Sequence, residues 1–357
     1  MVGLPEIIIA FKSKAVTAMK RSALGIVTLI LRDTTNNVLS SNVQVYKSIE
    51  DLKPGDWSEK NIDYIKKTLL GTPSKVIAIR MTESESDTLP NILKLAGSRR
   101  FNYLAMPEVT AQEAEDIASW IKSKRTNDHK TFKAVLPNQA ADSSGVINFT
   151  TGNIKVGERI YTTAEYTARI AGILAGLPFT QSSTYFVLSE VDSITETETP
   201  NEDINAGQLI LINDGEKIKI GRGVNSLVTI TSDMKEDYKK IKITEIMDMI
   251  HDDIFSTFEN HYVGKVPNIY DNQVLFITSI GAYFKGLASE EILDPNAQNF
   301  AEVDVETQRL AWESIGTDTT DWDDQKVKEM SFSSNVFLGG AAKPVDAMED
   351  LKFNIAI

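Results

Sequence analysis

The chain has no cysteine and only three histidines among its 357 residues. Without cysteine there are no disulfides, no thiolate catalysis and no cysteine-based zinc or iron–sulfur site. The shortage of histidine leaves few side chains for acid–base catalysis or metal binding. No apolar run reaches the length of a membrane span, and the apolar start of the chain carries Glu6, which is not typical of a signal peptide. We therefore expect synthesis inside the cell and no insertion into a membrane.

Dense groups of basic residues are also missing, and the net charge is −13. A nucleic-acid-binding protein normally presents a basic face, so we expect no direct contact with nucleic acid. The acidic balance favours solubility and disfavours anionic membranes. A hydrophobic content of 42% beside 24% charged residues is enough for a sizeable core, and the length suits about two domains.

What the first two-thirds of the chain does contain is an alternation of strand and helix patterns. Such an alternation predicts βαβ units and a largely parallel sheet. Capping boxes begin two of the helices, at Thr110 with Glu113 and at Thr162 with Glu165. The second of these helices is rich in alanine and glycine, which favours burial against the sheet. The predicted strands are 25–32, 43–46, 76–80, 101–105, 132–136 and 145–149, and the other predicted helices are 58–70 and 89–95.

The pattern changes near Ser232, from alternating elements to successive helices. Before it, an Asp214–Gly215 turn predicts a hairpin of 207–212 with 217–220, followed by a strand at 224–231. After it we expect helices at 233–262, 268–287 and 304–315, an acidic loop at 317–328, a strand at 335–338, and a hinge at Gly339, Gly340 and Pro344. The fold class is thus α/β and α+β. The expected domains are an N-terminal arm at 1–22, an α/β core at 23–232, an α+β domain at 233–338 and a C-terminal arm at 339–357.

Both ends of the chain have the period of a strand with one apolar face. Basic residues flank the first strand and acidic residues precede the second, and opposite charges favour the pairing of unlike ends. From the residues alone, the two strands pair either within one subunit or between subunits. The residues expected at an interface between subunits are Ile7, Ile9, Phe11, Lys12, Lys14, Asp346, Glu349, Asp350, Leu351, Phe353, Ile355 and Ile357.

The motifs that might carry chemistry do not combine into a catalytic centre. Gly221 and Gly223 lie between predicted strands rather than before a helix, so a turn or bulge is favoured over a phosphate loop. His251 and His261 are ten positions apart on one predicted helix, so they do not lie one turn apart as facing metal ligands do. The run from Ser182 to Thr184 has no glycine bracket that would make a nucleophile elbow. We predict no catalytic, cofactor or metal site.

The order of several short motifs resembles the contractile tail sheath proteins of tailed phages and of phage-like particles such as R-type bacteriocins, especially the compact Gram-positive members. The resemblance runs nearly the whole length of the chain. It rests on residues 3–14 with 20–21, 171–178 with 183–185, 214–217 with 221–227, 264–268 with 270–272, 303–309, and 346–351.

This resemblance implies a subunit that stacks in rings around a tail tube. The terminal arms add strands to neighbouring subunits, and the connected rings rotate and shorten on contraction. The family's central domain is described as subtilisin-like but is not catalytic. The implied partners are further copies of the chain, the tail tube protein, and baseplate and tail terminator proteins. The implied location is the tail of a virion or phage-like particle, assembled in the host cytoplasm and released by lysis.

Our leading hypothesis is accordingly a structural sheath subunit that contracts to drive the tube through a target envelope. One alternative is an α/β enzyme whose termini pair within one subunit. Another is a tube or baseplate protein that uses the same arms.

Overall fold

The computed structural model describes residues 18–19, 25–35, 41–231 and 235–355. They form two compact units. The first, called here the α/β unit, lies within 22–252 and 344–357. The second, called the C-terminal unit, comprises residues 253–343 together with 18–19 in the described part of the chain. The helix that joins the units, α6 (Ile241–His261), has residues in both.

A seven-stranded sheet forms the centre of the α/β unit, in the order β10-β6-β5-β4-β1-β3-β2. All neighbours pair in parallel except β2, which runs antiparallel to β3 at one edge. The predicted, largely parallel sheet is confirmed. Its strands are β1 (Ile26–Arg32), β2 (Val43–Tyr46), β3 (Lys75–Met81), β4 (Tyr103–Ala105), β5 (Lys133–Pro137), β6 (Val146–Phe149) and β10 (Gln208–Leu209).

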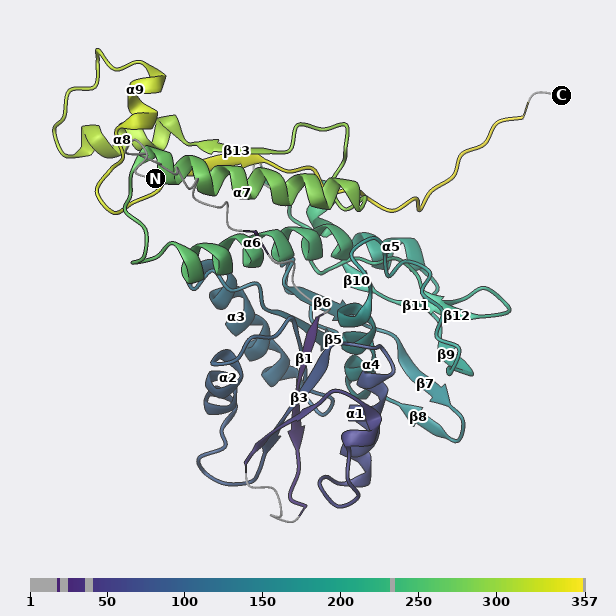
Figure 1. Cartoon of the computed structure of the whole chain (residues 1–357). Coiled ribbons are helices and arrows are strands. Elements are labelled where there is room, and N and C mark those ends of the chain that lie inside the picture. The colour runs from purple at the N-terminus through teal and green to yellow at the C-terminus, as the bar shows by residue number, and fades with distance from the viewer. Residues whose placement is uncertain (1–17, 20–24, 36–40, 232–234, 356–357) are drawn as a thin grey trace, which may run out of the picture. The chain divides into compact units, whose positions relative to one another are not determined.

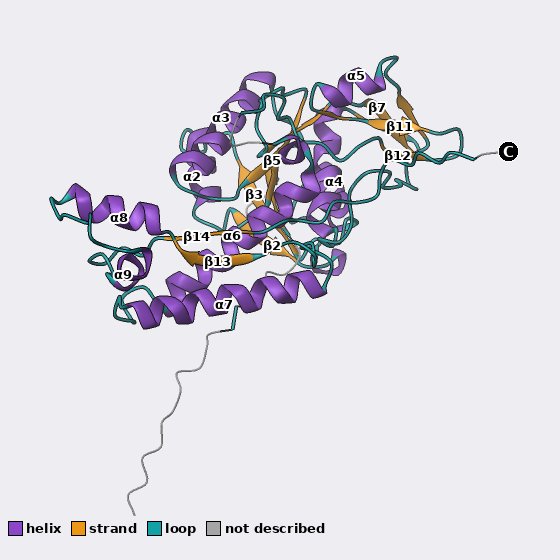
Figure 2. Cartoon of the chain, turned by 90° about the horizontal axis from the view of Figure 1, so that it is seen from above, coloured by secondary structure: helices purple, strands orange, loops and turns teal. Residues whose placement is uncertain are grey.

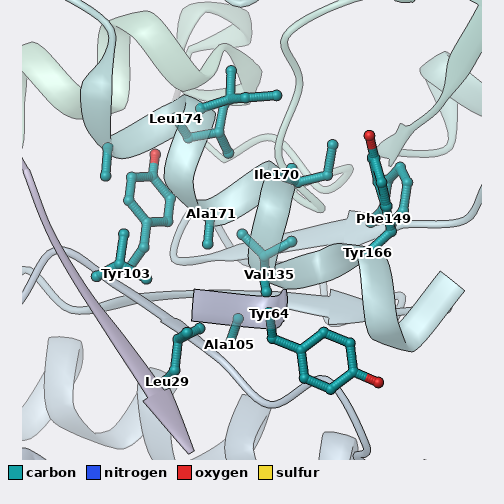
Figure 3. Packing of buried hydrophobic residues seen from close by; sticks show 14 of the residues in the cluster. Leu29, Tyr64, Tyr103, Ala105, Val135, Phe149, Tyr166, Ile170, Ala171 and Leu174 are labelled. Carbon is teal, nitrogen blue, oxygen red and sulfur yellow. The ribbon is translucent and has the colours of Figure 1, made fainter. Parts of the chain in front are cut away.

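Helices cover both faces of this sheet, and this is why its strands are apolar on both sides. Helices α1 (Glu59–Leu69) and α4 (Thr163–Gly176) pack on one face, and α2 (Leu89–Gly97) and α3 (Ala111–Asn127) on the other (Figure 1). Figure 3 shows the first interface, where side chains of α4, among them Ala171, face Val135 of β5. The capping boxes predicted at Thr110 and Thr162 begin α3 and α4.

The small residues of α4 allow a close contact with α1 and the turn that follows it. A Cβ added at Gly172 would lie 2.1 Å from the carbonyl oxygen of Thr68, and one added at Gly176 would lie 1.7 Å from that of Gly71. Since carbonyl groups of the backbone cannot move aside cheaply, glycine is required at both positions. The predicted burial of this helix is confirmed.

Smaller elements complete the α/β unit. They are a sheet of β7 (Gly152–Val156), β8 (Arg159–Tyr161) and β9 (Ser193–Thr195), the helix α5 (Pro200–Asn205), and the hairpin of β11 (Leu211–Asn213) with β12 (Ile218–Ile220). In the hairpin turn, Asp214 accepts backbone hydrogen bonds from Glu216 and Lys217. This agrees with the predicted Asp–Gly turn.

The strand predicted at 224–231 is wrong. The segment forms no continuous strand: Val224 makes an isolated bridge with Lys240, and Thr231 at its other end is a second isolated bridge residue. Three of its backbone N–H groups donate to side chains instead: Asn225 accepts from Leu227, and Asp142 accepts from Val228 and Thr229. These bonds replace the ladder that a strand would make.

The C-terminal unit combines helices with a two-stranded sheet. Figure 2 shows β13 (Phe300–Val303) and β14 (Leu338–Ala341) along α7 (Tyr270–Ser289). Two shorter helices follow β13, namely α8 (Val305–Ser314) and α9 (Asp324–Glu329). None of the helices in the described part of the chain is long and apolar enough to cross a membrane.

Three predictions for this part of the chain need correction: the start of a helix, an acidic loop and a hinge. Helix α6 begins at Ile241 rather than near 233, after a short 3₁₀ turn at Glu236–Lys239, because Val224 pairs with Lys240 and Gly223 accepts a hydrogen bond from Ile241. The predicted acidic loop contains α9, capped by Asp323, which accepts from Lys326. The predicted hinge glycines lie inside β14, where a Cβ at position 340 would come within 2.1 Å of the Phe300 carbonyl oxygen.

Candidate functional site

The last described residues, 351–355, are extended and exposed, and we call them the exposed segment. Leu351, Phe353 and Ile355 are 91%, 74% and 72% exposed, although all three are large and apolar. Figure 1 shows this segment extending away from the rest of the α/β unit. Within the described residues no strand pairs with it. Exposed apolar side chains in such a row are typical of a surface that is covered by a partner.

The residues just before it, 346–350, are fastened to the α/β unit, and we call them the anchor segment. Asp346 forms an ion pair with Lys240, and Asp350 forms one with Arg222 at 2.5 Å. The Glu349 side chain is only 7% exposed and lies between the two. The sequence predicted that these carboxylates complement Lys12 and Lys14, whereas the structure pairs them with cations of the chain's own α/β unit.

Glu349 occupies a small polar pocket. The hydroxyl groups of Ser182 and Thr184 both donate to its Oε1, at 2.8 and 2.7 Å. The guanidinium Nε of Arg222 lies 3.2 Å from its other oxygen, Oε2. The Thr184 hydroxyl in turn accepts from the backbone N–H of Gly223, at 2.9 Å. Two hydroxyl donors to Oε1 and the guanidinium charge near Oε2 offset part of the cost of burying this carboxylate. Its Oε2 accepts no hydrogen bond within the described residues.

The charges around this pocket affect one another. The hydrogen bond to Asp350 and the nearby charges of Asp350, Glu349 and Asp346 raise the pKa of Arg222 against the opposing effect of burial. Burial lowers the pKa of Lys242, and the same Asp346 and Glu349 oppose that shift. The anchor segment therefore brings three carboxylates to a part of the α/β unit that carries three cationic side chains.

Two motifs singled out from the sequence find their role here. Ser182 and Thr184 are hydrogen-bond donors to Glu349 rather than nucleophiles. Gly223 lets the 182–184 turn approach, since a Cβ at this position would lie 2.4 Å from the Ser183 hydroxyl oxygen. The segment from Gly221 to Gly223, for which a turn or bulge was favoured, therefore lies beside Glu349 and contributes the guanidinium of Arg222 to its surroundings. Sequence reasoning missed this grouping, and its only signal was the presence of two glycines around an arginine.

The two-stranded sheet of the C-terminal unit is the second feature relevant to pairing. Strands β13 and β14 pair only with each other within the described residues, from Phe300 with Ala341 to Val303 with Leu338. Each therefore has an outer edge that no other strand of the described residues pairs with. Isolated two-stranded sheets are marginal in water, and open edges readily accept another strand.

A buried ionic cluster lies elsewhere in the α/β unit, between α6 and the sheet. Asp248 of α6 accepts from Arg125, at 2.8 and 2.9 Å, and from Lys133, at 2.8 Å. Lys133 also lies 3.2 Å from Glu245, which accepts from the hydroxyl of Tyr103. Every charged group in the cluster has a partner of opposite sign. This arrangement holds α6 against β4, β5 and α3.

Charges at the carboxyl end of β1 are likewise satisfied. Burial raises the pKa of Asp33, but hydrogen bonds from Ser58, Asn61 and Thr35 outweigh it and lower the pKa below its ordinary value. Asp33 thus ties β1 to the start of α1. In the described ranges no three His, Asp or Glu side chains are grouped as metal ligands. Of the predicted interface residues, Ile7, Ile9, Phe11, Lys12, Lys14 and Ile357 lie outside the described residues.

Comparison with known proteins places these features in a family. Residues 83–226 match the model of the phage tail sheath protein central domain, and residues 233–357 match that of the phage tail sheath C-terminal domain. A tail sheath protein of Clostridium phage phiCD119 is 38% identical over 367 aligned positions, which cover 99% of each chain. The chain belongs to the phage tail sheath protein family. The family predicted from the sequence is confirmed, and a tail sheath protein is a structural component of a contractile tail.

Solved sheath structures share the fold at low sequence identity. The contracted helical sheath of the anti-feeding prophage has a TM-score of 0.70 at 13% identity, covering 99% of both chains. The crystal structure of a sheath tail protein from Desulfitobacterium hafniense has a TM-score of 0.68 at 16% identity, covering 84% of this chain and 94% of that one. The predicted fold class, an α/β sheet domain with an α+β domain, is confirmed for this sheath protein.

Proposed function

We propose that this sheath protein polymerises as a helical tube of stacked rings and that its exposed segment joins one subunit to another by strand addition. The observation that carries the proposal is the row of Leu351, Phe353 and Ile355. These exposed apolar side chains alternate along an extended segment as on one face of a strand, and no described strand pairs with it. Burying each of these side chains contributes roughly 1.5–3 kcal/mol. Ladder hydrogen bonds to the neighbour add to this and give the contact its direction.

The acceptor in the neighbouring subunit is the β13–β14 sheet. Its two outer edges provide places for two strands, which matches the number of predicted arms. A contact between an arm on one surface and an edge on another is heterologous, and repetition of it generates a helical polymer rather than a closed dimer.

The wider proposal follows the family. The assembled sheath surrounds a tail tube protein, ends at baseplate and tail terminator proteins, and contracts to drive the tube through a target envelope. The subunit performs no catalysis, binds no cofactor and makes no direct contact with nucleic acid. Assembly takes place in the host cytoplasm and release follows lysis. The domain boundaries expected from the sequence, with arms at 1–22 and 339–357 around a core domain and a C-terminal domain, stay a prediction, whereas the compact units divide after residues 252 and 343.

Deletion of residues 351–357 tests strand addition. We expect the truncated protein to remain a folded monomer with unchanged far-UV circular dichroism and to form no tubes under the electron microscope. The full-length protein should form hollow, striated tubes under the same conditions. Tubes from the truncated protein would exclude this segment as the joint.

Cysteine cross-linking tests the acceptor, and the absence of native cysteine makes it clean. Phe353→Cys and Phe300→Cys in one chain should give a ladder of covalent oligomers on oxidation of assembled tubes. Phe353→Cys with Ile160→Cys, an exposed position on β8 of the α/β unit, is the matched control and should give none. A ladder from the control pair alone would show that the exposed segment does not add to β13.

A further inference from the structure

We infer that the anchor segment, residues 346–350, fixes the point and direction at which the exposed segment leaves the α/β unit, and so positions it for the neighbouring subunit. This inference rests on the proposed strand addition. It assigns a positioning role to Glu349, Arg222 and Lys240, which lie in the body of the subunit or at the base of the arm rather than at the joint itself.

The attachment uses points that are distant along the chain. Asp346 reaches Lys240, just before α6; Glu349 reaches Ser182 and Thr184, beyond the end of α4; and Asp350, with Glu349, reaches Arg222, just after β12. Contacts at three separated points remove rotation about any single one. The five residues of the anchor segment are therefore held in one conformation.

The change from anchored to exposed is abrupt. The Glu349 side chain is 7% exposed, whereas that of Leu351, two positions later, projects into solvent. Between the attachment points, the Met348 side chain is fully exposed and makes no part of the attachment. The boundary between the fixed and the assembling part of the arm thus falls between Asp350 and Leu351.

Fixing the base of the arm matters for assembly because fewer residues must be ordered when the strand joins its neighbour. It also limits the positions that the exposed segment can reach. An arm without its anchor starts from near the end of β14 and samples many directions. We therefore expect loss of the anchor to weaken assembly even though the exposed segment itself is unchanged.

A spin label reports on the anchor without depending on assembly. Met348→Cys introduces the only cysteine, and a nitroxide attached to it in the dilute monomer should show slow motion that follows the whole subunit. Glu349→Ala in this background should shorten the rotational correlation time several-fold, towards the nanosecond motion of a loose terminus. Glu216→Ala, an exposed carboxylate in the β11–β12 turn, is the control and should leave the spectrum unchanged. Fast motion in the unsubstituted background would overturn the anchor.

Assembly provides the second readout. The protein concentration at half-maximal tube formation should rise several-fold for Glu349→Ala at an unchanged melting temperature. Reversing the half-exposed ion pair, Lys240→Asp with Asp346→Lys, should restore much of what Lys240→Asp alone loses. Normal assembly by a variant whose label has become mobile would overturn the positioning role. If the protein still assembles after deletion of 351–357, the proposed strand addition is wrong. The mobility of the spin label tests the anchor separately, because it is measured in the monomer.

Discussion

The guanidinium Nε of Arg222 lies 3.2 Å from Oε2 of Glu349, which joins the turn after β12 to the base of the C-terminal arm. This contact divides the end of the chain into an attached part and an exposed part. Substitutions in the exposed part should affect only the joint between subunits. Substitutions in the packed parts of the chain should affect the stability of the folded subunit. The predictions below use that separation.

Polar substitution in the exposed segment should abolish assembly and leave the monomer intact. Phe353→Ser removes a side chain that is 74% exposed, so the melting temperature should stay unchanged while tube formation, measured by sedimentation, is lost. Ile160→Ser, at a similarly exposed position on β8, is the control and should assemble normally. Equal loss of assembly in both variants would show a general effect of surface hydrophobicity.

Trypsin should cleave the monomer early after Lys352, because this residue is exposed and follows the last attachment at Asp350. Cleavage at exposed, extended segments is fast compared with cleavage in packed elements. Mass spectrometry of the first products measures this. In assembled tubes the same bond should resist, and equal rates in both states would argue against burial of the segment on assembly.

Gly172→Ala should destabilise the α/β unit, because the added methyl would lie 2.1 Å from the Thr68 carbonyl oxygen. Overpacking of this kind lowers the free energy of unfolding by about 1–3 kcal/mol, measured by denaturant titration. Gly281→Ala in α7 is the matched control: a methyl there has no heavy atom of the described residues within 4 Å. Because alanine is favoured over glycine in a helix interior, the free energy of unfolding of the control should rise by roughly 0.5–1 kcal/mol.

Asp248→Asn should be strongly destabilising at neutral pH. It leaves Lys133, which is 1% exposed, and Arg125 without their shared carboxylate, at a cost of about 3–5 kcal/mol in the free energy of unfolding. Asp324→Asn, which removes the exposed partner of Arg309, should change it little. Denaturant titration of the three proteins measures both effects.

The difference in unfolding free energy between wild type and Asp248→Asn should depend on pH, and the sign of this dependence can be predicted. Burial raises the pKa of Asp248, but the charges of Lys133 and Arg125 outweigh it and lower that pKa below the ordinary 3.8. A lowered pKa stabilises the fold above the unfolded-state value and loses this contribution as pH falls through the folded-state value. The difference in stability between wild type and Asp248→Asn should therefore be constant near neutrality and narrow below about pH 4. A difference that widens in acid would contradict this assignment.

The sequence was sufficient for elements whose signals are local. The apolar run at 25–32 predicted β1, and the capping boxes at Thr110 and Thr162 marked the starts of α3 and α4. The alternation of these elements was enough to predict the parallel sheet. Local signals failed where side chains replaced a strand ladder, as Asp142 and Asn225 do at 224–231, and where glycine served close pairing instead of a hinge, as Gly340 does in β14.

The anchor was beyond local reasoning for a different reason. Its members, Ser182, Arg222, Lys240 and Glu349, are spread over nearly half of the chain, and each taken alone reads as an ordinary surface residue. Charge patterning correctly marked Asp346, Glu349 and Asp350 as a group. It could not reveal that cations of the same subunit satisfy them, because it compared only the two ends of the chain. Their predicted place at an interface between subunits stays a prediction.

The placement of the anchor has a mechanical consequence. Tension applied to the arm beyond Leu351 meets the attachments at Asp350 and Glu349 before it meets the pairing of β14 with β13. The pull is then shared by Arg222, by the turn at Ser182 and by Lys240, three positions held by the packed α/β unit. When a neighbour pulls on the arm, the force would thus act on the extensively packed α/β unit. The hydrogen bonds between β13 and β14 would not carry this force.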